Sequence, residues 1–173
     1  TPVLRALRRA RPADRIVAMG KPFVRDLLSG SPWIDEWVSI GRDTPKGTWG
    51  QSGVLRARGP FDVGLLLTNS LGSALVMRLG GVRRRIGYAR EGRGVFLTDR
   101  LRPPPEADGS YRPAPMVNYY SRLLEPLGIA VDDTRFELFV TDDDRRAMDE
   151  LLEARRRRPE RRLVVLNPGA AFG

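Results

Sequence analysis

The 173-residue sequence contains neither cysteine nor histidine. The lack of cysteine excludes disulfides and thiolate metal sites, and it fits a reducing cytoplasm. The lack of histidine removes the commonest general base, the commonest zinc ligand and every Ser–His or Cys–His nucleophile. Acid–base chemistry must therefore use carboxylates here, or be completed by residues outside this sequence.

Lysine is scarce too, because only Lys21 and Lys46 are lysines among 30 cationic residues. The formal net charge is +9. Such arginine enrichment has two interpretations, a GC-rich genome or an anionic partner. An anionic partner would favour arginine because the guanidinium fork binds phosphate and carboxylate bidentately. Nucleic acid, an anionic membrane surface and a phosphorylated glycolipid are all candidate partners. Charge alone does not choose among them.

No apolar stretch approaches the roughly 18 residues that would span a membrane. Shorter patterns alternate along the chain, and a 41% hydrophobic content suffices for a globular core. Strands are expected at 15–19, 33–40, 61–67, 85–88, 136–140 and 163–166, and helices at 1–11, 21–28, 49–56, 71–79, 116–127 and 141–158. This alternation predicts an α/β fold with a Rossmann-like, doubly wound parallel sheet and helices on both faces.

The last strand pattern leads into a loop of small residues. Glycine lets backbone N–H groups approach an anion closely, so the loop is a candidate phosphate-binding turn, with an ordinary strand-to-helix turn as the alternative. Its residues are Gly169, Ala170, Ala171, Phe172 and Gly173. The helix that normally follows is absent, and Thr1-Pro2 suits the start of a helix. We therefore expect an internal piece of a longer protein.

Two further segments carry candidate binding residues. Asn69 and Ser70 lie where a strand meets a helix, the usual ligand-facing edge of an α/β sheet, although either could be a simple N-cap. Arg90 and Arg93 lie in a loop after the next strand, where they could bind acidic groups or be solvated surface residues. Asp62 and Asp99 are possible acid–base groups without a visible pairing, and the sequence shows no metal-ligand pattern.

Four motifs in register resemble the bacterial lipopolysaccharide heptosyltransferases of glycosyltransferase family 9. They are the opening T-P-V-L-R-A-L-R-R-A-R-P, T-N-S-L-G-S-A-L from Thr68, G-G-V-R-R-R-I-G-Y from Gly80, and the closing N-P-G-A-A-F-G. P-M-V-N-Y-Y from Pro115 is similar as well. The pattern is nearest to the heptosyltransferase II branch, and the resemblance spans nearly the whole chain.

The resemblance implies the N-terminal half of a two-domain GT-B enzyme. Residues 1–160 would form the acceptor-side domain, truncated at its start, and 161–173 the first strand and phosphate loop of the donor domain. The implied reaction is an inverting transfer of heptose from ADP-heptose to the lipid A–core oligosaccharide, at the cytoplasmic face of the inner membrane and without a cofactor. The implied base, an Asp, lies upstream of Thr1, and a donor-side Lys follows the final turn, so this chain alone is expected to be inactive.

On the same basis, Asn69, Ser70, Arg90 and Arg93 are expected to bind the acceptor, and Gly169–Gly173 the donor. A different class of function is an anion-binding module, for nucleic acid or a membrane surface, without catalysis. The basic residues are spread through every element and no recognised nucleic-acid motif is present, which favours the enzyme.

Overall fold

The computed structural model describes residues 1–41, 43, 45–102, 115–155 and 164. It divides into two compact units, Thr1–Phe139 and Val140–Gly173, and each is described by itself. The expected strand at 163–166 lies outside the described residues except for Val164, which is 74% exposed. The loop Gly169–Gly173 also lies outside them, so its proposed role stays a prediction.

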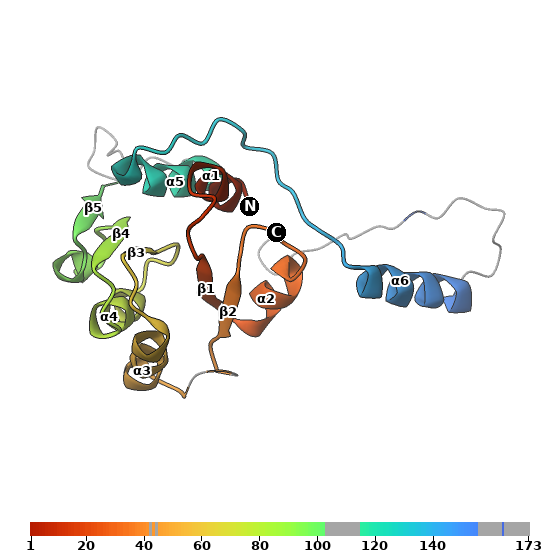
Figure 1. Cartoon of the computed structure of the whole chain (residues 1–173), viewed down its shortest axis with the longest axis horizontal. Helices are drawn as coiled ribbons and strands as arrows, with labels where there is room; N and C mark the ends of the chain where they lie inside the picture. The colour runs from red at the N-terminus through yellow and green to blue at the C-terminus, as the bar shows by residue number, and fades with distance from the viewer. Residues whose placement is uncertain (42, 44, 103–114, 156–163, 165–173) are drawn as a thin grey trace. The chain divides into compact units, whose positions relative to one another are not determined.

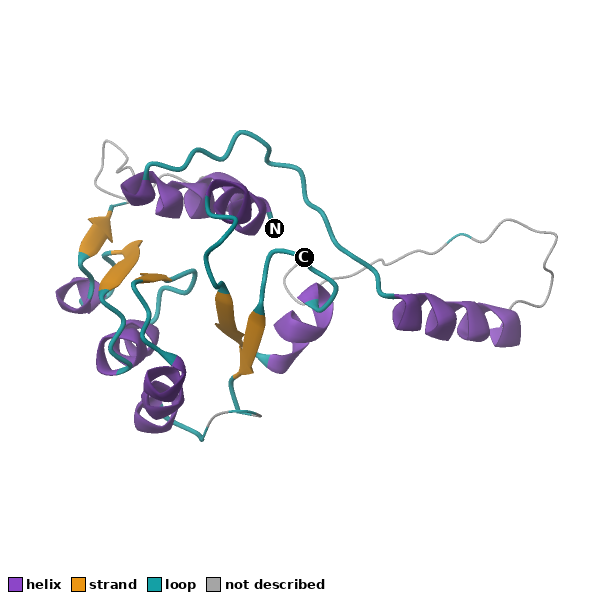
Figure 2. Cartoon of the chain, viewed as in Figure 1, coloured by secondary structure: helices purple, strands orange, loops and turns teal. Residues whose placement is uncertain are grey.

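Helices and strands alternate along the first unit (Figure 1; Figure 2). In chain order the elements are α1 (Pro2–Ala10), β1 (Val17–Gly20), α2 (Pro22–Leu28), β2 (Glu36–Ser39), α3 (Thr48–Arg58), β3 (Val63–Leu65), α4 (Leu71–Leu79), β4 (Arg84–Tyr88), the 3₁₀ helix η1 (Arg93–Phe96), β5 (Asp99–Leu101), α5 (Met116–Ser121) and the 3₁₀ helix η2 (Arg122–Leu127), followed in the second unit by α6 (Asp142–Arg155).

All strand pairs in the described residues are parallel, which confirms the predicted α/β class. Within the described residues the strands form two sheets, with orders β1-β2 and β3-β4-β5. Val17 pairs with Glu36 in the first sheet, and Leu65 pairs with Ile86 in the second. Within the described part of the chain, β1 and β3 each pair on one side only. The polypeptide thus contains two parallel-sheet fragments, each built by strand–helix–strand crossovers.

One face of the β3–β4–β5 sheet packs against α5 and η2. Ile86 and Tyr88 of β4 are buried there with Leu101 of β5 and Leu123 of η2. Ile86 and Tyr88 share this face because strand side chains alternate with a period of two. Partly buried Tyr119 of α5 packs on the same cluster, while α5 itself contacts α1 (Figure 1).

The opposite face of the sheet is covered by α4, which also packs against α3. Gly64 of β3 faces this helix, and a Cβ added there would lie 2.6 Å from Met77 Sδ and 2.9 Å from Val82 Cγ1. A larger residue here would therefore force these side chains to move. Leu55, Val76 and Val82 form the buried cluster on this side. Helices thus lie on both faces of the three-stranded sheet, as predicted.

One predicted helix is divided in the structure, and one strand of the structure was not predicted. The helix expected over 116–127 is divided into α5 and η2, because Pro126 has no N–H for the α-helical ladder and restricts the residue before it. The strand β5 was not expected at all. Its three residues are too few to show a period of two, and they lie just before Pro103, Pro104 and Pro105.

The strand expected at 136–140 is also wrong, because these described residues form no strand. Their alternation does not bury a face, since Phe136 is 75% exposed. The backbone binds side chains instead of a neighbouring strand. Buried Arg5 of α1 donates to the carbonyl oxygens of Asp133 and Arg135 at 2.8 and 3.1 Å, and the amide of Glu137 donates to the Thr1 hydroxyl at 3.0 Å.

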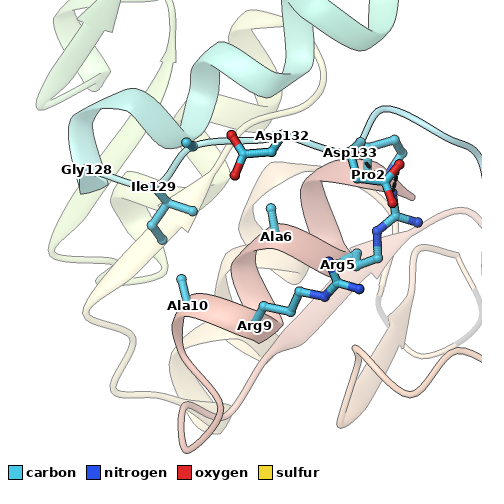
Figure 3. A pocket seen from close by; sticks show the side chains of 10 residues that line it. Pro2, Arg5, Ala6, Arg9, Ala10, Gly128, Ile129, Asp132 and Asp133 are labelled. Atoms are coloured by element: carbon cyan, nitrogen blue, oxygen red, sulfur yellow. Dashed lines mark hydrogen bonds and ion pairs between the residues drawn. The ribbon is translucent and has the colours of Figure 1, made fainter.

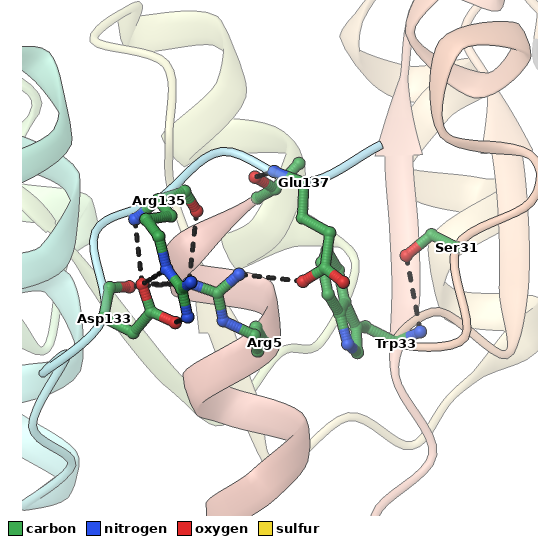
Figure 4. Close-up of polar contacts among 7 residues, drawn as sticks. Arg5, Ser31, Trp33, Asp133, Arg135 and Glu137 are labelled. Carbon is green, nitrogen blue, oxygen red and sulfur yellow. Dashed lines mark hydrogen bonds and ion pairs between the residues drawn. The ribbon is translucent and has the colours of Figure 1, made fainter. Parts of the chain in front are cut away.

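Arg5 is the centre of an ionic cluster (Figure 4). Its guanidinium lies 3.1 Å from the Asp133 carboxylate and 2.9 Å from that of Glu137. Hydrogen bonds from the Arg135 side chain and backbone, together with the charge of Arg5, hold the pKa of Asp133 well below its usual range. The segment after η2 is therefore fixed to α1 by charge rather than by a strand ladder.

In the second unit, α6 begins at a reciprocal cap. The amide of Asp144 donates to Thr141 Oγ1 at 3.1 Å, and the amide of Thr141 donates to the Asp144 carboxylate at 3.0 Å. This confirms Thr141 as the predicted N-cap, with three aspartates in the first turn that suit the helix dipole.

We expect Asp133→Asn to lower the melting temperature of the chain at pH 7. Because the folded-state pKa of Asp133 lies below the unfolded value of about 3.9, its stabilisation is present above that value and is lost as pH falls through the folded pKa. The difference from wild type should therefore shrink toward pH 2 in thermal melts. Asp132→Asn is the matched control, because Asp132 is exposed and makes none of these contacts. A pH-independent difference would contradict the ionic account.

Candidate functional site

The predicted acceptor residues lie together at the carboxyl edge of the β3–β4–β5 sheet. Asn69 and Ser70 connect β3 to α4, while Arg90 and Arg93 follow β4. The structure brings the two segments into contact, because Arg93 Nη2 donates to Asn69 Oδ1 at 3.0 Å. This edge is where open α/β sheets bind their ligands.

Ser70 is the N-cap of α4, which was one of the two roles expected for it from the sequence. Its Oγ accepts a hydrogen bond from the Ser73 amide at 3.2 Å, and its side chain lies at the surface. The Ser73 hydroxyl donates back to the Ser70 carbonyl at 2.8 Å and accepts from Thr68 at 2.8 Å. These bonds order the start of α4 and place Ser70 beside Asn69.

Arg93 is completely buried, which overturns the interpretation of a solvated surface arginine at this position. Its Nε donates to the Tyr88 carbonyl at 2.6 Å, and its Nη1 donates to the Thr68 carbonyl. Arg93 thus donates to the carbonyl oxygens of Tyr88 and Thr68 and to Asn69 Oδ1, and all three oxygens are uncharged. With no exposed surface, the side chain can influence a ligand only through these neighbours.

The backbone conformation before Arg93 directs this side chain into the interior. Gly92 adopts a left-handed conformation with φ 74°, which glycine accepts without strain, and the Arg93 amide donates to the Arg90 carbonyl at 3.0 Å. In the strand, a Cβ added at Gly87 would lie 3.2 Å from Leu66 and 3.5 Å from Arg93 Nη2. Gly87 of the R-x-G-Y pattern is thus packed tightly against Leu66 and lies next to the guanidinium.

Two tyrosines that the sequence did not single out for the site complete this arrangement. The rings of Tyr88 and Tyr119 are stacked, with centroids 3.8 Å apart and planes inclined by 13°. Tyr88 Oη donates to the Tyr119 carbonyl at 2.6 Å, and Tyr119 Oη donates to Asn69 Oδ1 at 3.1 Å. In the sequence, the P-M-V-N-Y-Y motif was the one feature that pointed to Tyr119. Its contact with Asn69 is visible only in the tertiary structure.

Burial perturbs both ionisable groups at the centre of this cluster. Burial raises the pKa of Tyr88 to about 12, so its hydroxyl remains a donor at neutral pH. Burial also lowers the pKa of Arg93, with the adjacent Glu91 opposing the effect, yet a guanidinium stays protonated in proteins. The edge therefore contains a permanent positive charge whose hydrogen-bond acceptors among the described residues are neutral oxygens, with the Glu91 carboxylate nearby.

The candidate acid–base groups lie at the opposite edge. Asp99 begins β5, where Arg84 at the start of β4 binds it through three hydrogen bonds of 2.7–3.2 Å. Those bonds lower the pKa of Asp99. Asp62 precedes β3 and pairs with Arg83 at 3.1 Å, both side chains being exposed. Neither carboxylate reaches the carboxyl edge, where the predicted acceptor residues are.

A separate cavity of about 400 Å³ lies between α1 and the segment after η2 (Figure 3). Arg5 and Arg9 of α1 line it opposite Asp132 and Asp133. None of the predicted acceptor residues lines this cavity, and its mixed charges do not favour one ligand class.

The described residues contain neither a metal-binding cluster nor a membrane-spanning helix. No group of three or more acidic side chains is placed to hold a metal ion there. In that same part of the chain, no helix has both the length and the apolar content to cross a membrane.

The sequence profile of glycosyltransferase family 9, the heptosyltransferases, matches residues 55–173. That range includes the edge cluster, which consists of Asn69, Ser70, Tyr88, Arg90, Arg93 and Tyr119. Comparison with curated protein sequences gave no match.

Two solved structures have a similar fold. A glycosyl transferase family 9 protein from Veillonella parvula DSM 2008 aligns with a TM-score of 0.71 and 20% identity, over 89% of this chain and 44% of that one. ADP-heptose LPS heptosyltransferase II from E. coli aligns with a TM-score of 0.60 and 22% identity, over 87% and 45%. The chain therefore spans less than half the length of either protein, and both share its α/β fold with parallel sheets.

We expect Arg93→Met to lower the free energy of unfolding by about 3 kcal/mol, because the Tyr88 and Thr68 carbonyls lose a charged donor in a buried place. Urea titration of the chain measures this. Arg83→Met is the control, since the Arg83 side chain is 74% exposed and pairs with an exposed carboxylate, so its loss should cost less than about 1 kcal/mol. Equal losses in both variants would contradict the structural role of Arg93.

Proposed function

The chain belongs to glycosyltransferase family 9, and we propose that it is the acceptor-side part of an enzyme that transfers heptose from ADP-heptose to the lipopolysaccharide inner core. The observation that carries this proposal is the edge cluster. Asn69, Ser70 and Arg90 follow two neighbouring parallel strands and offer polar groups, while buried Arg93 supplies positive charge beneath them. Such a surface suits an anionic saccharide.

We propose that the donor binds at Gly169–Gly173, where backbone N–H groups would contact the diphosphate of ADP-heptose. The pattern of strand residues followed by N-P-G-A-A-F-G supports this role. Since Ala170 and Ala171 have no polar side chain, the backbone would provide the contacts.

We propose an inverting mechanism whose general base is an Asp in a segment that precedes Thr1. Two observations support this. The described carboxylates Asp62 and Asp99 pair with arginines at the other edge of the sheet. In addition, β1 and β3 are both unpaired on one side in the described residues, and the strand order 3-2-1-4-5-6 of a doubly wound sheet has one strand between these positions.

We further propose that the enzyme works as a peripheral protein at the cytoplasmic face of the inner membrane. The net charge of +9, carried almost entirely by arginine, supports this, because basic surfaces bind anionic lipid headgroups. The acceptor, lipid A with its core saccharide, would lie at that surface.

We expect the 173-residue chain to bind deacylated, heptose-deficient core oligosaccharide but to release no ADP from ADP-heptose. The physical reason is that the base and most of the donor domain are supplied elsewhere. Isothermal titration measures the binding, and a coupled assay measures ADP. ADP release that depends on the oligosaccharide would disprove the placement of the base. Binding to DNA or anionic vesicles without binding to the oligosaccharide would favour the anion-binding module.

We expect Arg90→Ala to weaken binding of the same oligosaccharide by about tenfold to a hundredfold, because hydrogen bonds to charged groups contribute about 1.5–3 kcal/mol. Arg83→Ala is the matched control, since Arg83 lies at the amino edge of the same sheet. The two dissociation constants should differ clearly in titrations at constant salt. If both variants bind like wild type, Arg90 does not contact the acceptor.

A further inference from the structure

Asn69, Tyr88, Arg93 and Tyr119 form a closed circuit of hydrogen bonds. Arg93 donates to the Tyr88 carbonyl, the Tyr88 hydroxyl donates to the Tyr119 carbonyl, and the Tyr119 hydroxyl donates to Asn69 Oδ1. Arg93 closes the circuit by donating to the same Oδ1. The circuit joins three segments that are distant in sequence, and each member is held from two sides.

The circuit fixes which way the Asn69 carboxamide faces. Arg93 Nη2 can only donate, and the Tyr119 hydroxyl has its proton directed at the same atom, so the accepting atom must be Oδ1 rather than Nδ2. The Nδ2 group therefore points away from both partners. Among the residues that the structure describes, it donates no hydrogen bond, and the neighbouring Thr68 and Ser70 are exposed.

We propose that Arg93 and Tyr119 are positioning residues that hold Asn69 as a fixed two-proton donor toward the acceptor saccharide. This inference rests on the proposed function. The ligand chemistry follows from the donor: Nδ2 binds an oxygen that can only accept, such as a carboxylate oxygen of the acceptor, and rejects a group that only donates. Asn69 thus selects for an oxygen at one place on the acceptor.

The surrounding residues suit such a fixed group. The stack between Tyr88 and Tyr119 restricts the Tyr119 ring, so its hydroxyl cannot move away from Asn69 without breaking an aromatic contact. Arg93 is buried completely and makes three hydrogen bonds. A donor that is ordered before the ligand arrives loses less entropy on binding, which is how supporting residues raise affinity without touching the ligand.

Asn69→Asp is the decisive variant. Its carboxylate can still accept from Arg93 and Tyr119, and it adds an ion pair with Arg93, so the melting temperature should equal or exceed that of wild type. Nδ2 is replaced by an oxygen, which repels the acceptor oxygen. We expect the 173-residue chain to bind deacylated, heptose-deficient core oligosaccharide at least about tenfold more weakly.

Tyr119→Phe tests the positioning role. It keeps the aromatic stack but removes one hydrogen bond that fixes the amide, so binding should weaken about threefold to tenfold while the fold is retained. The side-chain ¹⁵NH₂ resonances of Asn69, assigned by their absence in Asn69→Asp, should shift when the oligosaccharide is added to wild type. If the circuit had only a structural role, Tyr119→Phe would bind the oligosaccharide like wild type, and the oligosaccharide would not shift the Asn69 resonances.

Asn118→Asp is the matched control. It makes the same chemical change and adds the same charge one residue from Tyr119, but Asn118 is exposed and its side chain is not in the circuit. Binding close to the wild-type value would show that the loss in Asn69→Asp comes from the donor rather than from net charge.

The outcomes separate this inference from the proposed function. If wild type binds the oligosaccharide and Asn69→Asp binds it equally well, the fixed-donor role is overturned while the proposed function stands. If Tyr119→Phe alone is unchanged, Tyr119 is not a positioning residue. If wild type does not bind the oligosaccharide, the acceptor assignment fails, and the role of Asn69 fails with it.

Discussion

The buried guanidinium of Arg93 is the interaction on which the carboxyl edge of the sheet depends. It contacts the end of β4 and the β3–α4 connection, and it lies next to the closely packed Gly87. A buried charge without carboxylate contacts must be surrounded by carbonyl dipoles. The carbonyl groups of Tyr88 and Thr68 therefore have to face Arg93, and the hydrogen bond from Arg93 to Oδ1 orients the Asn69 amide.

Arg5 has a comparable role on α1. Its hydrogen bonds to two carbonyl oxygens replace those that a neighbouring strand would have made for the segment after η2. In both cases a long side chain satisfies backbone groups that have no partner in a sheet. Some of the arginines in the chain therefore have a structural role. The net charge is not explained by an anionic partner alone.

The charges also differ between the two edges of the three-stranded sheet. At the amino edge, Asp62 and Asp99 are paired with Arg83 and Arg84. At the carboxyl edge, the charge of Arg93 is contacted by neutral oxygens. Arg93 thus makes no direct hydrogen bond to a carboxylate among the described residues, which agrees with the proposed site for an anionic acceptor.

The sequence by itself determined the α/β class, the capped starts of α4 and α6, and the family motifs, because these depend on local periodicity, cap chemistry and residue spacing. It predicted a strand at 136–140 from alternation alone, and it missed β5, which has too few residues to show a pattern. Arg93 and Arg90 are indistinguishable in the sequence as loop arginines. Only the tertiary structure decided that Arg93 is buried and that Tyr119, fifty residues from Asn69, orients its amide, because both facts depend on contacts between segments that the sequence does not order in space.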